Sequence, residues 1–214
     1  VGVGYAAGSA VTTGVQNTLI GSLAGDAITT GSNNVALGRS SLGANTTASN
    51  NTAVGYSSLV LNTTGTSNVA VGANALDANT TAHNNTAVGY DALTTNTTGA
   101  SNTALGQGAL ELNTTASNNT AVGKDALTAN TTGAGNTAIG FSSMSASTTG
   151  GNNTAVGQYS LTANTTGYQT VSIGDESLAA STTGATNVAV GYRALKANTT
   201  ASNNTAVGSS ALVA

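Results

Sequence analysis

The sequence predicts an all-β fold, a parallel β-solenoid in which each coil contains seventeen residues. Three observations predict this fold. Glycine recurs every seventeen residues from Gly4 to Gly208 without a slip, and a fixed period is the signature of stacked repeats. A short alternation of β-branched and small residues precedes each of these repeat glycines, and an Asn-Thr-Thr turn sequence follows most of them. The whole chain is therefore expected to form a rod.

The first element of each repeat is a short strand that ends at the repeat glycine. The residue before that glycine is always aliphatic, as at Val88 and Val122, and Thr or Val usually stands two places earlier. This period-two pattern predicts a strand with its larger side chains on one face and alanine on the other, so that a neighbouring layer can approach the alanine face closely. Glycine follows because the backbone there needs a positive φ or has no room for a Cβ atom, as we expect at Gly55, Gly72 and Gly89.

A leucine four residues after the repeat glycine forms the second element. It recurs in ten copies, among them Leu93, Leu110 and Leu127, and is replaced once by Met144. The leucines are expected to stack as a file on a second short strand. Methionine has a similar volume, so Met144 is interpreted as a core residue.

Two corners complete the coil. Asn-Thr-Thr followed by Gly or Ala predicts a type I turn, and the exchange of Gly for Ala indicates that no positive φ is needed there. The asparagine before each strand, as at Asn85, Asn102 and Asn119, is expected to lie about 4.8 Å from its equivalents and to form a hydrogen-bonded ladder. Asn-x-Thr sequences are interpreted as ladder and turn residues, with sugar attachment left open to a glycosylating host. They include Asn45, Asn50, Asn62, Asn79 and Asn96.

Residues 1–30 form divergent starting coils, and residues 31–214 form the regular repeats. In the first two copies Gly8 and Gly25 replace the leucine, and an apolar residue, Val11 or Ile28, stands three places later. We expect the second strand to face differently there, at the base of the rod. Since the chain begins and ends within a repeat, we also expect it to be part of a longer protein.

Composition argues against several classes of function. The net charge of −3 leaves no basic surface for nucleic acid, and no apolar run is long enough for membrane insertion. The chain has no cysteine, and its single histidine, His83, is interpreted as an exposed spacer. The acidic residues are scattered, without an acid–base pair or a metal-binding motif. We predict no enzyme activity, no cofactor and no metal.

The residue after the repeat glycine varies from copy to copy while its neighbours repeat. A position with this freedom is expected to face solvent, where exposed aromatic rings suit contact with a cell-surface glycan or a protein receptor. An aromatic ladder that stabilises the sheet explains the same residues equally well. The candidate contact residues are Tyr5, Tyr56, Tyr90, Phe141, Tyr192 and, one place later, Tyr159.

Each coil offers only a few aliphatic side chains, and the chain has no Trp and one Phe. We therefore expect several copies, most simply three, to pack around a shared axis. The axis would be lined by the aliphatic residues before the repeat glycines or by the leucine files.

The Asn-Thr-Ala-Val-Gly strand followed by x-x-Ala/Ser-Leu resembles the repeat of YadA-like trimeric adhesin heads, with residues 19–25 nearest to that pattern. The Asn-Thr-Thr-Gly turn is similar to repeats of bacteriophage tail fibres and large bacterial surface proteins. The resemblance implies a left-handed, homotrimeric β-roll that supports attachment to a host or surface. It also implies an extracellular place, on a virion tail or a bacterial cell.

Two other functions are kept open. An ice-binding solenoid would need a flat surface of two files, which Asn130 and Thr132 could supply. A self-assembling extracellular filament is the second alternative.

Overall fold

The computed structural model describes residues 1–213; Ala214, the last residue of the 31–214 segment, lies outside the described part. Thirteen strands form one parallel sheet in the order in which they occur in the chain, and residues 1–213 contain no helix. The strands are β1 (Gly2–Val3), β2 (Thr18–Ile20), β3 (Val35–Leu37), β4 (Thr52–Val54), β5 (Val69–Val71), β6 (Thr86–Val88), β7 (Thr103–Leu105), β8 (Thr120–Val122), β9 (Thr137–Ile139), β10 (Thr154–Val156), β11 (Val171–Ile173), β12 (Val188–Val190) and β13 (Thr205–Val207).

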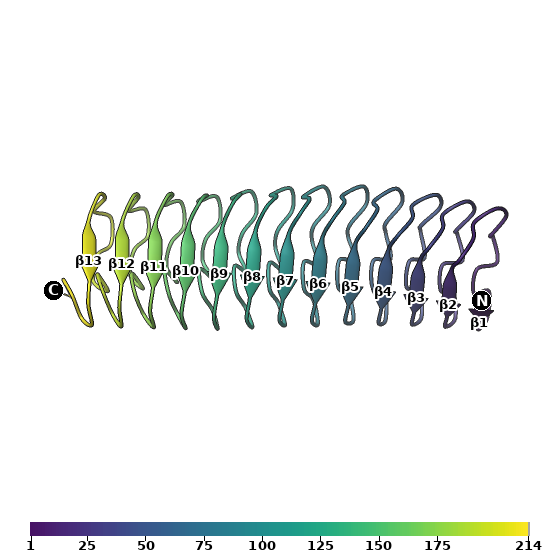
Figure 1. The fold of residues 1–214 in the computed structure, drawn as a ribbon, viewed down its shortest axis with the longest axis horizontal. Helices are drawn as coiled ribbons and strands as arrows, with labels where there is room; N and C mark the ends of the chain where they lie inside the picture. Colours follow the sequence, from purple (N-terminus) through teal and green to yellow (C-terminus); the bar gives the residue numbers. More distant parts are fainter. Residues whose placement is uncertain (214) are drawn as a thin grey trace.

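The register is seventeen residues throughout. Thr52 pairs with Val69, and Val88 pairs with Leu105, each seventeen positions further along the chain. In Figure 1 the strands lie side by side along the rod, each joined to the next by a loop, and the two termini lie at opposite ends. The predicted parallel solenoid of 17-residue coils is confirmed.

Each coil contains one strand, and the prediction of a second strand at the leucine is wrong. Leu93 and Leu110 have a φ of 53°, in the left-handed region, which is incompatible with an extended strand. The residue two places before each of them also has a positive φ or is glycine. The backbone still bonds from coil to coil, because the Leu93 amide donates to the Ala109 carbonyl at 3.0 Å. The return segment is thus a series of tight turns that keeps the vertical hydrogen bonds of a sheet.

The interior of the rod is narrow and consists of stacked files. The central alanine of the strand, such as Ala87 or Ala121, is fully buried, and so are the leucines of the return segment and Met144. Alanine therefore faces the leucine layer, as its small size predicted. The larger strand side chains point away from the interior, and the side chain of Val88, for example, remains 37% exposed. Because the leucines lie inside each coil, the expectation that leucine files could line an axis between chains is wrong.

Two asparagine ladders run through the coil. In the predicted ladder, the Asn102 amide donates to Asn85 Oδ1 at 2.9 Å, and Asn102 Nδ2 donates across the coil to the Ala116 carbonyl at 2.9 Å. The second ladder uses the first residue of Asn-Thr-Thr: Asn113 Nδ2 donates to Asn96 Oδ1 at 2.8 Å. The sequence predicted a turn at this corner, and its asparagines also form a ladder. Both files are buried and tie neighbouring coils together.

Both reasons offered for the repeat glycine hold. Gly89 has a φ of 144°, and a Cβ atom built there would lie 2.4 Å from the Gly106 carbonyl oxygen. Gly55 and Gly72 show the same combination, with φ of 136° at each. By contrast, Gly65 in the Asn-Thr-Thr turn has no positive φ, as the exchange with alanine predicted.

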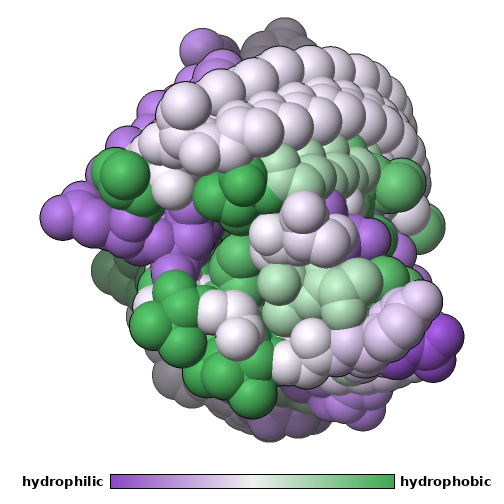
Figure 2. Space-filling model, turned by 90° about the vertical axis from the view of Figure 1, so that its right-hand side faces the viewer, coloured by the Kyte–Doolittle hydropathy of each residue, from purple (hydrophilic) through white to green (hydrophobic). Residues whose placement is uncertain are grey.

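The first two coils contain no second strand, because Gly8 and Gly25 have φ of 62° and 54°, so the prediction that this strand faces differently there is wrong; their first strands continue the same sheet. In these two coils, the apolar side chains that fill the interior come from other positions of the repeat. Leu19 stands at the alanine position of β2 and Ile28 at an asparagine position, and both are buried. A Cβ atom at Gly25 would lie 2.8 Å from the side chains of both residues, so glycine leaves the space that they fill. Figure 2, which faces the N-terminal end, shows apolar atoms around this end of the interior.

Candidate binding edge

The charged residues of the chain all fall at three positions of the repeat: one, two and five residues after the repeat glycine. Since equivalent residues stack from coil to coil, these positions form one longitudinal strip, which we call the variable edge. Its charged members are Asp26, Arg39, Asp77, Asp91, Glu111, Lys124, Asp125, Asp175, Glu176, Arg193 and Lys196. The outward side chains of the strands, which we call the strand face, and the Asn-Thr-Thr turns carry no charge.

Backbone geometry places the variable edge at a turn. The residue two places after the repeat glycine has a positive φ, as at Asp91 (53°) and Asp125 (57°). Its amide bonds to the coil before it: the Asp91 amide donates to the Ala73 carbonyl at 3.2 Å, and the Asp125 amide donates to the Gln107 carbonyl at 2.9 Å. The edge is therefore a hydrogen-bonded part of the rod from which side chains project into solvent.

The aromatic candidates are exposed on this edge, as predicted. Tyr5, Tyr56, Tyr90, Phe141, Tyr159 and Tyr192 all expose more than a third of their surface, from 38% at Phe141 and Tyr159 to 79% at Tyr5.

These rings form no continuous ladder. Over residues 1–213 the one aromatic pair is Phe141 with Tyr159, whose centroids lie 5.3 Å apart in an edge-to-face arrangement. An arginine covers two further rings, Arg39 at 5.9 Å from the Tyr56 centroid and Arg193 at 4.8 Å from that of Tyr192. The ladder interpretation therefore holds only for Phe141 and Tyr159. The other rings stay exposed, although an arginine lies against Tyr56 and Tyr192.

Acidic side chains dominate the middle of the edge. Asn74 Nδ2 donates to Asp91 Oδ1 at 3.0 Å, and Thr94 Oγ1 donates to Asp77 Oδ1 at 3.1 Å. Partial burial raises the pKa of the Asp77 carboxyl, although the Thr94 hydrogen bond opposes the shift. The neighbouring Asp91 carboxylate raises the pKa of the Tyr90 hydroxyl.

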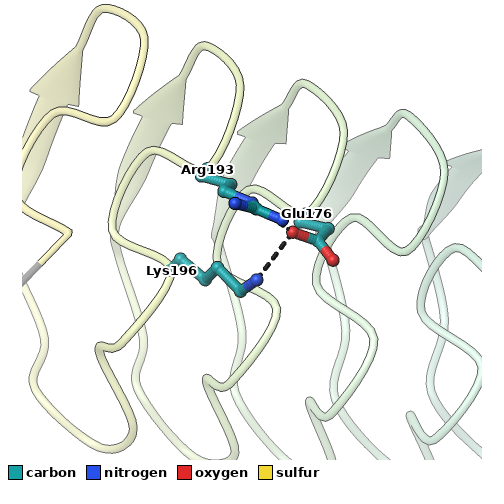
Figure 3. A network of polar contacts seen from close by, with 3 residues as sticks. All are labelled: Glu176, Arg193 and Lys196. Carbon is teal, nitrogen blue, oxygen red and sulfur yellow. Dashed lines mark hydrogen bonds and ion pairs between the residues drawn. The ribbon is translucent and has the colours of Figure 1, made fainter.

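Near the C-terminal end, an ion-pair cluster joins two coils (Figure 3). The Glu176 carboxylate accepts from Lys196 Nζ at 2.6 Å and from the Arg193 guanidinium. These bonds, the one from Lys196 first, lower the pKa of Glu176. The three side chains satisfy one another, and we interpret the cluster as a link between coils.

The surroundings of His83 were predicted only in part from the sequence. His83 is exposed, as predicted, but its Nδ1 also accepts a hydrogen bond from the Thr66 amide at 2.9 Å. Serine takes this role in other coils, as where Ser117 Oγ accepts from the Ala100 amide at 3.0 Å. Recognising the equivalence of His83 and Ser117 in the repeat would have revealed the bond.

The Asn-x-Thr sequences separate into two groups. Asn45, Asn62, Asn79 and Asn96 are fully buried, while Asn50 is exposed. Asn130 is also buried, whereas Thr132 is exposed, so the two-file Asn-x-Thr surface suggested for ice binding does not exist.

Among the described residues, no cluster of three His, Cys, Asp or Glu side chains is arranged to hold a metal ion. The same residues include no helix long and apolar enough to cross a membrane. No known protein family, characterised protein or solved structure matches the chain.

Proposed function

We propose that this chain is a shaft segment of an extracellular fibre in which three copies form a left-handed homotrimer. The observation that carries the proposal is the contrast between the strand face and the variable edge. The strand face is free of charge along its length, and its aliphatic file stays partly exposed in a single chain, with Leu105 at 37% and Ile139 at 40%. A continuous apolar strip of this kind marks an association surface.

The dimensions of the strand face support association. Thirteen strands about 4.8 Å apart and about 10 Å wide give a strip on the order of 600 Å². Standard pairwise interfaces bury about 800 Å² on each partner, whereas a trimer would divide this strip between two neighbours, about 300 Å² each, so flanking residues would also have to contribute. In a homotrimer the strand faces would surround the axis, and the three variable edges would face solvent.

The decisive experiment compares two neighbouring residues of β8. Val122 points outward and Ala121 points into the coil. Val122→Asp should leave the single chain folded but prevent association, because the charge would be buried only between chains. Ala121→Asp should prevent folding itself. Light scattering and circular dichroism separate the two effects; a folded wild-type monomer at micromolar concentration, or a Val122→Asp variant that associates like wild type, would refute the trimer.

The place of the fibre, a phage tail or a bacterial surface, is proposed from the resemblance of the repeat to tail-fibre and YadA-like sequences. The gene beyond both ends of this segment is the test. A membrane-anchor barrel would favour an adhesin, whereas a tail-attachment or chaperone domain would favour a phage fibre. The proposed role in both cases is to hold a binding region away from the particle or cell, without catalysis.

Ice binding remains a second candidate, now on the strand face. Thr86, Thr103 and Thr120 form a file beside the aliphatic residues, and this file continues as Thr or Val in the other coils. Regularly spaced hydroxyl and methyl groups on a flat face would suit an ice lattice only if the face were free. Thermal hysteresis in a monomeric wild-type chain, abolished by Val122→Asp, would favour this function over the trimer.

A further inference from the structure

Two tyrosines of the variable edge stand two coils apart with only a small residue between them. Tyr56 and Tyr90 are 53% and 54% exposed, and Ala73 occupies the same position in the intervening coil. Their backbone positions are separated by about 9.6 Å along the rod, twice the spacing of neighbouring strands. The edge therefore presents two exposed tyrosines two coils apart, with the small side chain of Ala73 at the same position in the coil between them.

The backbone under both rings is fixed before any ligand arrives. The Tyr56 carbonyl accepts from the Asn74 amide at 3.0 Å, and the Tyr90 carbonyl accepts from the Gly108 amide at 3.0 Å. Each residue is thereby tied to the next coil. Because the backbone under both rings is already ordered, binding a ligand there would cost little backbone entropy. This low cost favours binding even where the contact surface is narrow.

Polar groups lie beside the rings. Asn74, in the coil between the two tyrosines, donates to Asp91, which directly follows Tyr90, and Gln107 is exposed in the coil after Tyr90. Such side chains can exchange hydrogen bonds with hydroxyl groups of a ligand. Arg39 lies near the Tyr56 ring but leaves it half-exposed.

The charged residues around Tyr56 and Tyr90 restrict the charge that a ligand can carry. From residue 39 to residue 125 the edge carries four acids, Asp77, Asp91, Glu111 and Asp125, and two bases, Arg39 and Lys124, so this stretch is net negative. An anionic polymer would be repelled from this stretch. The leading pockets of the described residues lie at the two ends of the rod, whereas Tyr56 and Tyr90 stand on its exposed side, where an extended ligand fits better than a compact one.

We propose that Tyr56 and Tyr90 form a binding site for an uncharged, β-linked oligosaccharide that lies along the rod. The apolar faces of its sugar rings would pack on the two aromatic rings, which suit such contacts because they combine apolar area with a polar end. Extended β-1,4-linked chains of glucose or N-acetylglucosamine repeat every two sugar units, at a length close to the separation of the two tyrosines. The site goes beyond the proposed shaft function and does not require a particular number of chains.

Isothermal titration calorimetry with three uncharged tetrasaccharides tests the site: cellotetraose, xylotetraose and tetra-N-acetylchitotetraose. At least one of them should bind, and maltotetraose, which is α-linked and curved, should not. Tyr56→Ser and Tyr90→Ser should each weaken binding by about tenfold, as expected for the loss of one aromatic contact. Serine is compatible with this position because Ser22 and Ser209 occupy it in other coils.

Tyr168→Ser is the matched control. Tyr168 is 53% exposed, like Tyr56, but it stands at the corner after the Asn-Thr-Thr turn rather than on the variable edge. Binding should be unchanged in this variant. Failure of all three β-linked sugars to bind at millimolar concentration, or equal losses in Tyr168→Ser and Tyr90→Ser, would overturn the site. A wild-type monomer that binds the sugar would refute the trimer and leave this site intact.

Discussion

The interior of the rod and its variable edge share one period but tolerate change very differently. At the centre of the strand, alanine recurs in most coils because the leucine layer lies directly against it, as at Ala87 and Ala104. One residue after the repeat glycine, the same period contains Tyr90, Gln107 and Lys124 in consecutive coils. Packing restricts the residue at the strand centre. The residue after the repeat glycine faces solvent and can therefore be aromatic, polar or charged. Five predictions test this contrast.

The largest effect is expected from a single methyl group at a repeat glycine. Gly89→Ala would place a Cβ atom 2.4 Å from a backbone oxygen and impose a φ of 144° on alanine. We expect a loss of at least about 3 kcal/mol in the free energy of unfolding. Gly43→Ala is the control, since Gly43 has no positive φ and its nearest contact would be 3.3 Å. Urea denaturation measures both, and equal stabilities would contradict the account of the repeat glycine.

Two leucines in one coil give the next test. Leu110 is fully buried, and Leu112, two residues later, is 43% exposed. Leu110→Ala should reduce the free energy of unfolding by about 2–5 kcal/mol, because it leaves a cavity in the leucine file. Leu112→Ala should change it by no more than about 0.5 kcal/mol. If thermal denaturation gave similar losses for the two variants, the interior would be misplaced.

How far the sequence predicts the structure also differs between the interior and the variable edge. The solenoid, its register and the files of Ala87 and Leu93 could be predicted because a fixed period forces equivalent residues to stack. The second strand could not be excluded, because leucine has no preference for the left-handed φ that Leu93 adopts. That conformation comes from the closed path of the coil, which local propensity does not encode.

The binding edge was predictable in outline only. Variation after the repeat glycine identified Tyr56 and Tyr90 as exposed, because a position that accepts Ser, Gln and Lys cannot lie in a tight interior. The sequence did not show whether the rings stack, since that depends on which coils carry them. Phe141 and Tyr159 meet because they occupy neighbouring coils, whereas Tyr56 and Tyr90 are separated by Ala73.

The asparagine ladder should show an intermediate effect. Asn102→Ala removes the acceptor of the Asn119 amide and the donor to the Ala116 carbonyl, both within the buried file. The Ala116 carbonyl keeps the hydrogen bond from Asn113 Nδ2, but the Asn119 amide loses its acceptor, which should cost about 1–3 kcal/mol in the free energy of unfolding. Hydrogen exchange at the Asn119 amide should accelerate more than at the amide of Asn68, two coils before Asn102. Unchanged exchange at Asn119 would contradict a role for the ladder in joining coils.

A smaller, pH-dependent effect is expected on the variable edge. The pKa of Glu176 lies below its ordinary value of 4.5, so its ion pairs stabilise the fold above that pH. This contribution is lost as the pH falls through the lowered pKa. Asp77 acts in the opposite sense: its raised pKa makes its protonation on acidification favour the folded state. Glu176→Gln should therefore remove the loss of stability at low pH that Glu176 causes, and Asp77→Asn should increase the net loss.

The smallest effect is expected at His83, because serine occupies the same repeat position in other coils. His83 Nδ1 accepts from the Thr66 amide, so its neutral ring must carry the proton on Nε2. Serine accepts the equivalent amide bond at Ser49 and Ser117. His83→Ser should therefore leave the thermal midpoint unchanged, whereas His83→Ala should lower stability by about 0.5–1 kcal/mol through loss of the acceptor. If serine and alanine were equally destabilising, the histidine would contribute through its ring rather than its lone pair, and the equivalence of the coils would end at this corner.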